Sequence, residues 1–148
     1  MDEAAIKGAR ILIVDDEEES VRLLERILER AHYTQVRSTT DPNRALELFR
    51  EYRPDLVLLD LRMPGKDGLE VLAELRAEIP ESTYLPVLVL TADASIESRR
   101  RALVAGARDF VTKPFDDFEV LLRIWNLLET RLLYLELQRA AAGAPGGA

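Results

Sequence analysis

The sequence lacks cysteine altogether and contains a single histidine, His32, among its 148 residues. These absences exclude disulfide bonds, thiolate-ligated metal sites and thiol nucleophiles. We interpret His32 as a residue at the end of a helix, because a metal site built on histidine would need a second one. The absence of cysteine also fits a cytoplasmic protein.

Long apolar runs and an excess of positive charge are missing as well. No run approaches the roughly 20 residues that span a bilayer. The acidic start, Met1-Asp2-Glu3, lacks the basic and then apolar layout of a signal peptide. The net charge is −7, from 20 basic and 27 acidic residues, which argues against nucleic acid or an anionic membrane as the main partner. We therefore expect a cytoplasmic protein that binds neither directly.

Four short apolar runs are present in a chain long enough for one domain with a substantial core. The runs are 11–14, 56–59, 87–90 and 110–111. The first three are continuous rather than alternating, which is typical of central parallel strands covered on both faces. Residues 35–38 form a weaker candidate for a strand near an edge. Segments with helical spacing separate the runs, so the order is strand and then helix, five times over. This order predicts an α/β, doubly wound parallel sheet.

The last helix is predicted to be unusually long. It can run from Asp116 or Asp117 to Ala142 without glycine or proline, about 40 Å at 1.5 Å per residue. Its apolar positions alternate three and four apart, as in a heptad seam. The seam consists of Phe118, Leu121, Trp125, Leu128, Leu132 and Leu135. We expect it to pack on the sheet as far as Leu128 and to pair with a second copy in a homodimer beyond that point.

Polar residues follow the apolar runs where ligands bind in open α/β sheets, at the carboxyl ends of the strands. They are Asp15, Asp16, Asp60, Thr91 and Lys113. Three neighbouring carboxylates repel one another unless a cation lies among them, and Mg2+ suits such oxygen ligands. The metal and Lys113 would together neutralise an incoming phosphoryl group. Asp60 is the natural nucleophile, and Thr91 can donate its hydroxyl to a phosphoryl oxygen.

An alternative is that residues 15–19 are only an acidic run, favoured at a helix N-terminus by the helix dipole. This explains residues 17–19, which begin the next helix. It explains little about Asp15 and Asp16, because they directly follow a buried strand.

Segments within residues 9–130 closely resemble the receiver domains of two-component response regulators. They are Val-Asp-Asp-Glu at 14–17, Leu-Asp-Leu-Arg-Met-Pro-Gly-Lys-Asp-Gly at 59–68, Thr-Ala at 91–92 and Asp-Phe-Val-Thr-Lys-Pro-Phe at 109–115. The resemblance implies a flavodoxin-like, five-stranded sheet of order 2-1-3-4-5. It also implies a signalling phosphoacceptor rather than an enzyme, one that assists its own phosphorylation and dephosphorylation.

The resemblance further implies the role of each site residue. Asp60 would be phosphorylated by a sensor histidine kinase or a phosphotransfer protein. Asp15, Asp16, Asp60 and the backbone carbonyl of Arg62 would bind Mg2+. Thr91 would move toward the phosphoryl group and draw Phe110 inward.

Two further features of the family bear on this sequence. The resemblance implies a cis bond between Lys113 and Pro114. The switch aromatic is Phe110 where many members carry tyrosine, so it has no hydroxyl to offer a partner.

The predicted final helix outruns the usual end of a receiver domain. Residues 126–133 resemble the helical linker of receivers attached to cyclic-di-nucleotide enzymes, particularly HD-GYP phosphodiesterases. We therefore expect an N-terminal tail at 1–8, a receiver domain at 9–130, a helical extension or coiled-coil linker at 131–142 and a flexible tail at 143–148. The output domain or output protein is expected outside this chain, which is either a fragment or a stand-alone receiver.

Three other functions fit the sequence less well. A haloacid-dehalogenase-like phosphatase also uses aspartate, threonine, lysine and Mg2+, but its nucleophile follows the first strand in an Asp-x-Asp pattern, unlike Asp15-Asp16 and the later Asp60. A flavin or nucleotide binder needs a glycine-rich loop after the first strand, where this chain is acidic. A purely structural dimerisation module would not need the complete set of site residues.

Overall fold

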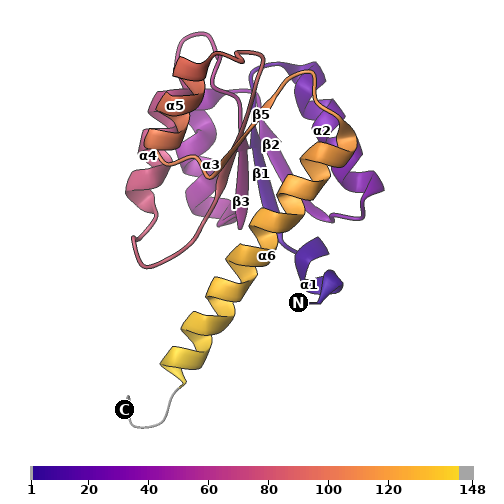
Figure 1. Cartoon of the computed structure of the whole chain (residues 1–148), viewed down its shortest axis with the longest axis vertical. Helices are drawn as coiled ribbons and strands as arrows, with labels where there is room; N and C mark the ends of the chain where they lie inside the picture. Colours follow the sequence, from indigo (N-terminus) through magenta and orange to yellow (C-terminus); the bar gives the residue numbers. More distant parts are fainter. Residues whose placement is uncertain (1, 144–148) are drawn as a thin grey trace.

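The computed structural model of the protein describes residues 2–143 (Figure 1). Five parallel strands form a single sheet in the order β2-β1-β3-β4-β5. The strands are β1 (Arg10–Val14), β2 (Gln35–Thr39), β3 (Leu56–Leu59), β4 (Val87–Thr91) and β5 (Asp109–Thr112). This topology confirms the predicted flavodoxin-like fold, with the weakest strand of the sequence pattern, β2, at an edge.

Helices cover both faces of the sheet. They are α1 (Glu3–Lys7), α2 (Glu18–Arg30), the short 3-10 helix η1 (Pro42–Arg44), α3 (Ala45–Tyr52), α4 (Gly68–Glu78), α5 (Ile96–Val104) and α6 (Asp117–Ala142). In Figure 1, α2 and α6 lie on one face, and α3, α4 and α5 lie on the other. Each face has its own hydrophobic core. In β1, Ile11 and Ile13 enter the core on the α2 and α6 face, whereas Leu12 and Val14 enter the core on the α3, α4 and α5 face. This is why the central strands are continuously apolar.

The N-terminal segment differs from the tail predicted for residues 1–8. It forms α1, whose Ile6 is fully buried in the core shared with α2 and α6. Lys7 Nζ donates to the carbonyl oxygen of Ala31 at 2.6 Å and lies over the ring of Tyr33. A five-residue helix with one buried apolar position is too short to give a periodic signal, so the sequence pattern did not indicate it.

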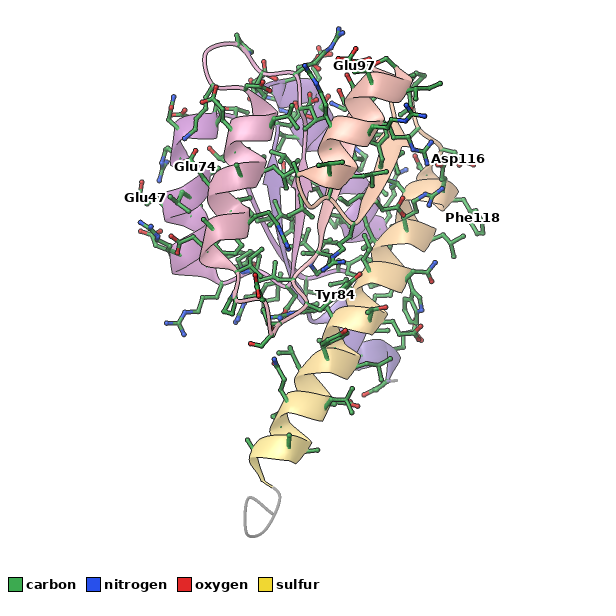
Figure 2. The ribbon with its side chains drawn as sticks, turned by 60° about the vertical axis from the view of Figure 1, so that its left-hand side comes forward. Glu47, Glu74, Tyr84, Glu97, Asp116 and Phe118 are labelled. Atoms are coloured by element: carbon green, nitrogen blue, oxygen red, sulfur yellow. The ribbon has the colours of Figure 1, made fainter. Side chains whose placement is uncertain are left out.

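The register of α6 also differs from the predicted seam. Phe118 is 72% exposed and points away from the sheet in Figure 2, whereas Val120, Ile124 and Leu127 are buried. The stripe that packs on the sheet therefore lies one residue away from the predicted one. Both stripes are apolar on this helix, so spacing alone could not choose between them. Leu128 belongs to the predicted seam and is fully buried.

The helix is nevertheless as long as predicted, and its last turns extend beyond the sheet (Figure 1). Within residues 2–143, none of the helices combines the length and the apolar character that crossing a membrane requires.

Candidate functional site

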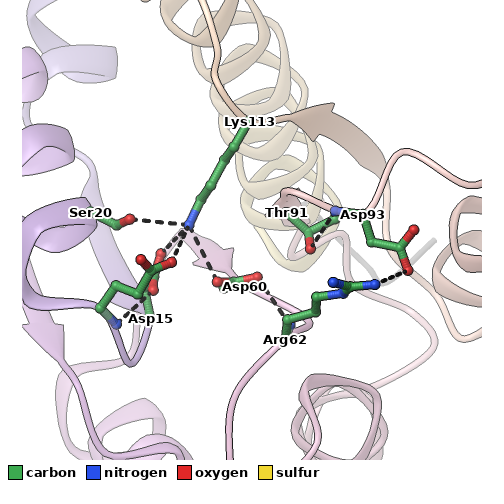
Figure 3. A network of polar contacts seen from close by, with 8 residues as sticks. Asp15, Ser20, Asp60, Arg62, Thr91, Asp93 and Lys113 are labelled. Atoms are coloured by element: carbon green, nitrogen blue, oxygen red, sulfur yellow. Dashed lines mark hydrogen bonds and ion pairs between the residues drawn. The ribbon is translucent and has the colours of Figure 1, made fainter.

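The carboxyl ends of four strands bring the predicted site residues to one edge of the sheet (Figure 3). Asp15 follows β1, Asp60 follows β3, Thr91 ends β4 and Lys113 follows β5. Tyrosines aside, Asp15, Asp60 and Thr91 are the only buried polar or charged residues within residues 2–143, with 2%, 4% and 0% exposure. Burial of such groups is costly unless their partners are close.

Three carboxylates meet at this edge. Asp15, Asp16 and Asp60 each offer an oxygen, and these oxygens lie within 4.8 Å of one another. Asp16 Oδ1 is buried and has no hydrogen-bond partner among the described residues. An unpartnered buried carboxylate oxygen is costly, and a hard divalent cation would satisfy it. The donor set therefore fits a metal ion such as Mg2+.

Lys113 is the cation that the structure places among these acids. Its Nζ donates to Asp15 Oδ2 at 2.7 Å, to Asp60 Oδ2 at 3.3 Å and to Ser20 Oγ at 3.2 Å. The cis bond predicted between Lys113 and Pro114 is present. Ser20 was not predicted, because it lies inside α2 and has no pattern that distinguishes it from a surface serine.

The ionisation of this pair reflects its burial. Loss of solvent raises the pKa of Asp15, although hydrogen bonds from Lys113 and from the amide of Glu17 oppose the shift. Burial alone would lower the pKa of Lys113, but the hydrogen bonds and charges of Asp15 and Asp60 outweigh it, so this pKa is raised. Lys113 therefore remains an ammonium group, which is the form that can bind a phosphoryl oxygen.

An ion pair between Arg62 and Asp93 lies beside Asp60. The Arg62 amide donates to Asp60 Oδ1 at 3.1 Å, and the Arg62 guanidinium lies 3.4 Å from the carboxylate of Asp93 (Figure 3). The amide of Asp93 in turn donates to Thr91 Oγ1 at 3.4 Å. Hydrogen bonds from Ser98 and then Ser95 lower the pKa of Asp93. The ion pair thus joins the loops that follow β3 and β4, and no sequence motif indicated it.

Gly68 fixes the backbone behind Asp60. A Cβ atom at Gly68 would lie 2.5 Å from the carbonyl oxygen of Asp60, which is closer than real Cβ atoms approach other atoms. The first residue of α4 must therefore lack a side chain for the loop after β3 to hold this shape. Asp67 caps the same helix by accepting from the Leu69 amide at 3.1 Å.

Phe110 lies inward in this structure. It is 5% exposed and packs in the core on the α3, α4 and α5 face, with the Arg99 guanidinium 5.9 Å from its ring centre. In the sheet it pairs with Val89, two residues before Thr91. The inward position that the sequence predicted for the phosphorylated state is thus already adopted here.

Comparison with known proteins agrees with this geometry. The response regulator receiver domain family matches residues 11–125. The chain is 42% identical over 137 residues to response regulator PleD of Caulobacter vibrioides, covering 92% of this chain and 30% of that protein. It is 39% identical over 127 residues to the regulatory protein AtoC of Escherichia coli, covering 86% and 26% respectively. The chain thus spans about a third or less of the length of these relatives.

Solved structures lead to the same family. A CheY-like response regulator receiver domain protein from Methanospirillum hungatei is 27% identical with a TM-score of 0.77, over 84% of this chain and 96% of that one. NtrX of Brucella abortus is 34% identical with a TM-score of 0.80, over 89% and 29%. The chain therefore belongs to the response regulator receiver domain family of two-component signalling systems.

Proposed function

We propose that this receiver domain accepts a phosphoryl group on Asp60, from the phosphohistidine of a sensor kinase or phosphotransfer protein, in the presence of Mg2+. The observation that carries the proposal is the position of Lys113, whose ammonium group contacts Asp15 and Asp60. Asp16 belongs to the same carboxylate cluster, and its Oδ1 has no hydrogen-bond partner within residues 2–143. A purely structural module would gain nothing from burying this set of charges.

In the proposed step, a carboxylate oxygen of Asp60 attacks phosphorus. The phosphorus–nitrogen bond of the phosphohistidine breaks, its electron pair stays on the imidazole, and that nitrogen takes up a proton. Lys113 binds one phosphoryl oxygen and neutralises its charge, while Thr91 donates its hydroxyl to another. The product is an acyl phosphate on Asp60.

Asp15, Asp16, Asp60 and the backbone carbonyl of Arg62 would hold Mg2+. When bound, the ion supplies positive charge that stabilises negative charge on the phosphoryl oxygens. The same protein groups would assist hydrolysis of the acyl phosphate, so the domain would promote both phosphorylation and dephosphorylation of itself. Kinases that use cytoplasmic ATP would place this reaction in the cytoplasm.

Thr91 and Phe110 would form the switch. Thr91 Oγ1 accepts from the Asp93 amide at 3.4 Å, a long hydrogen bond that Thr91 can give up when it moves to donate its hydroxyl to a phosphoryl oxygen. Because Phe110 is already inward, we propose that phosphorylation stabilises this inward position rather than creating it.

The test of the proposed chemistry is phosphorylation by acetyl phosphate with Mg2+. Intact-mass measurement should show one added phosphoryl group in the parent and none in Asp60→Asn. The matched control is Asp67→Asn, the same change in the same loop, which preserves the helix cap and should leave labelling intact. Excess chelator should abolish labelling of the parent. Stoichiometric labelling of Asp60→Asn would contradict the assignment.

We also propose a weak homodimer through α6, with different contact residues from those of the predicted seam. Leu128 is fully buried and Leu132 packs against the core, so neither is free to pair with a second copy. Leu133 and Leu137 are 45% and 67% exposed, and their four-residue spacing places them on one face. Pairing two such faces would bury this apolar surface.

Sedimentation velocity across a concentration series tests the dimer. Leu133→Glu combined with Leu137→Glu should shift the parent's association to higher concentration or remove it. Leu122→Glu, also on an exposed part of α6 but outside the extension, serves as the control and should associate like the parent. A parent that stays monomeric at every concentration, phosphorylated or not, would rule the dimer out.

A further inference from the structure

The end of α6 is attached to the receiver by polar contacts after it has left the sheet. Arg131 Nε lies 3.2 Å from Asp55 Oδ1, and its Nη1 donates to the carbonyl oxygen of Tyr84 at 3.1 Å. The side chains of this ion pair are only 12% and 14% exposed. Such a shielded charge pair is far less weakened by solvent than an ordinary surface pair.

Two further contacts extend the attachment along the helix. The rings of Tyr134 and Tyr84 are stacked with their centres 5.3 Å apart and an interplanar angle of 20°. Tyr84 lies beside α6 in Figure 2. Gln138 Nε2 donates to the carbonyl oxygen of Ser82 at 3.0 Å.

These residues continue the stripe by which α6 packs on the sheet. Their positions alternate three and four apart along one face: Val120, Ile124, Leu127, Arg131, Tyr134 and Gln138. The stripe is apolar over the sheet and polar beyond it, where its partners are Asp55 and the loop 82–85 rather than a strand. This spacing places all six residues on a single helix face. The polar contacts therefore hold the extension along the same axis that the apolar contacts fix for the part of α6 over the sheet.

The partner residues are themselves well fixed. Asp55 Oδ2 accepts from the Arg10 amide at 2.9 Å, and the Asp55 amide donates to the Arg10 carbonyl at 2.7 Å. Asp55 thus joins Arg131 to the start of β1 and to the segment that leads into β3. The Arg108 guanidinium lies 5.0 Å from the ring centre of Tyr84. The loop 82–85 leads directly into β4, whose other end carries Thr91.

We propose that Arg131, Tyr134 and Gln138 form a latch that holds the C-terminal extension of α6 in one direction relative to the sheet. The latch keeps the extension helical and fixed in orientation, whereas an unattached helix end would fray. Anything that binds the extension would meet it at one angle, set by Asp55 and the loop that precedes β4. The latch face is separate from the face of Leu133 and Leu137, so it leaves that apolar surface accessible.

Distance measurement between spin labels tests the latch without phosphorylation, so the result does not depend on Asp60. The chain has no cysteine, and labels can therefore be attached at Glu47→Cys in α3 and Ala141→Cys in α6, both exposed. The otherwise unchanged protein should give one narrow distance distribution. Arg131→Met, which keeps the length of the side chain but loses its charge and donors, should lose that single narrow peak.

Arg139→Met is the matched control, because the Arg139 guanidinium is recorded only in contact with the Leu135 carbonyl of its own helix within residues 2–143. It should keep the narrow peak. Hydrogen exchange on the unlabelled proteins provides a second readout. Arg131→Met should speed exchange at 129–142 while 118–128 stays protected, which also shows that the domain remains folded. An Arg131→Met distribution as narrow as the parent's, with unchanged exchange at 129–142, would overturn the proposal.

Discussion

Replacing Lys113 with methionine is expected to destabilise the metal-free protein by about 3–5 kcal/mol at neutral pH. The side chains of Lys113, Asp15 and Asp60 are 14%, 3% and 4% exposed, so the two carboxylates would remain buried after losing the cation that contacts both. Removing one partner of a buried ion pair is costly because the remaining charge is uncompensated. Denaturant unfolding, followed through the fluorescence of Trp125, measures the change.

The loss of stability in Lys113→Met should become smaller in acid and in the presence of Mg2+. Hydrogen bonding and charge from Lys113 oppose the rise that burial causes in the pKa of Asp15, so without Lys113 burial would raise this pKa further in the folded state. The cost of burying the Asp15 charge is then present at neutral pH and falls as the pH drops through the folded pKa, so the difference in stability between variant and parent narrows in acid. Mg2+ should also reduce the difference in stability between Lys113→Met and the parent, because the ion can replace the missing positive charge.

Lys66→Met is the control for this experiment. Lys66 pairs with Glu74, whose side chain is 37% exposed, so its loss should cost no more than about 1 kcal/mol. Equal losses for the two lysine variants, with no effect of Mg2+ on Lys113→Met, would show that Lys113 does not neutralise the acidic cluster.

Asp16→Ala is expected to abolish stabilisation of the protein by Mg2+. At 100 times its dissociation constant, an ion that binds only the folded state stabilises it by about 2.7 kcal/mol. Asp16 Oδ1 is buried and has no hydrogen-bond partner among the described residues, so a metal ion would satisfy an atom that otherwise lacks a ligand. Without metal, the variant should be at least as stable as the parent, because one repelling carboxylate has been removed.

Thermal unfolding with and without Mg2+ checks this prediction. Glu18→Ala is the control, since Glu18 is an exposed acid nearby that pairs with Arg22. It should retain the full Mg2+ shift. If Mg2+ raises the melting temperature of Asp16→Ala as much as that of the parent, Asp16 is not a ligand.

The sheet and the position of the site could be predicted because both depend on local patterns. Continuous apolar runs predicted central strands, and alternate residues of β1 do enter the two cores. The polar residues were identified by their place directly after those runs. Parallel strands end at one edge of the sheet, so Asp60 and Lys113 had to come close although they are far apart in the sequence.

Other features depend on tertiary contacts that leave no local pattern. The burial of Ile6 depends on a core that it shares with residues of α2 and α6, and one buried apolar residue near the N-terminus gives no periodic signal. The prediction that Phe118 packs on the sheet was wrong, because two adjacent stripes of α6 are apolar and spacing alone does not choose between them. The pairing of Arg131 with Asp55 joins residues 76 positions apart, so no local pattern indicates it.

The central claim is that Asp60, rather than a neighbouring acid, receives the phosphoryl group. The most direct test treats the protein with acetyl phosphate and Mg2+, reduces the acyl phosphate with borohydride to a stable residue, and locates it by peptide mass spectrometry. Trypsin separates Asp60, in peptide 51–62, from Asp15 and Asp16, in peptide 11–22. We predict that the modification lies on Asp60 alone. Modification of peptide 11–22, or none on peptide 51–62 under conditions that saturate the metal site, would contradict the account.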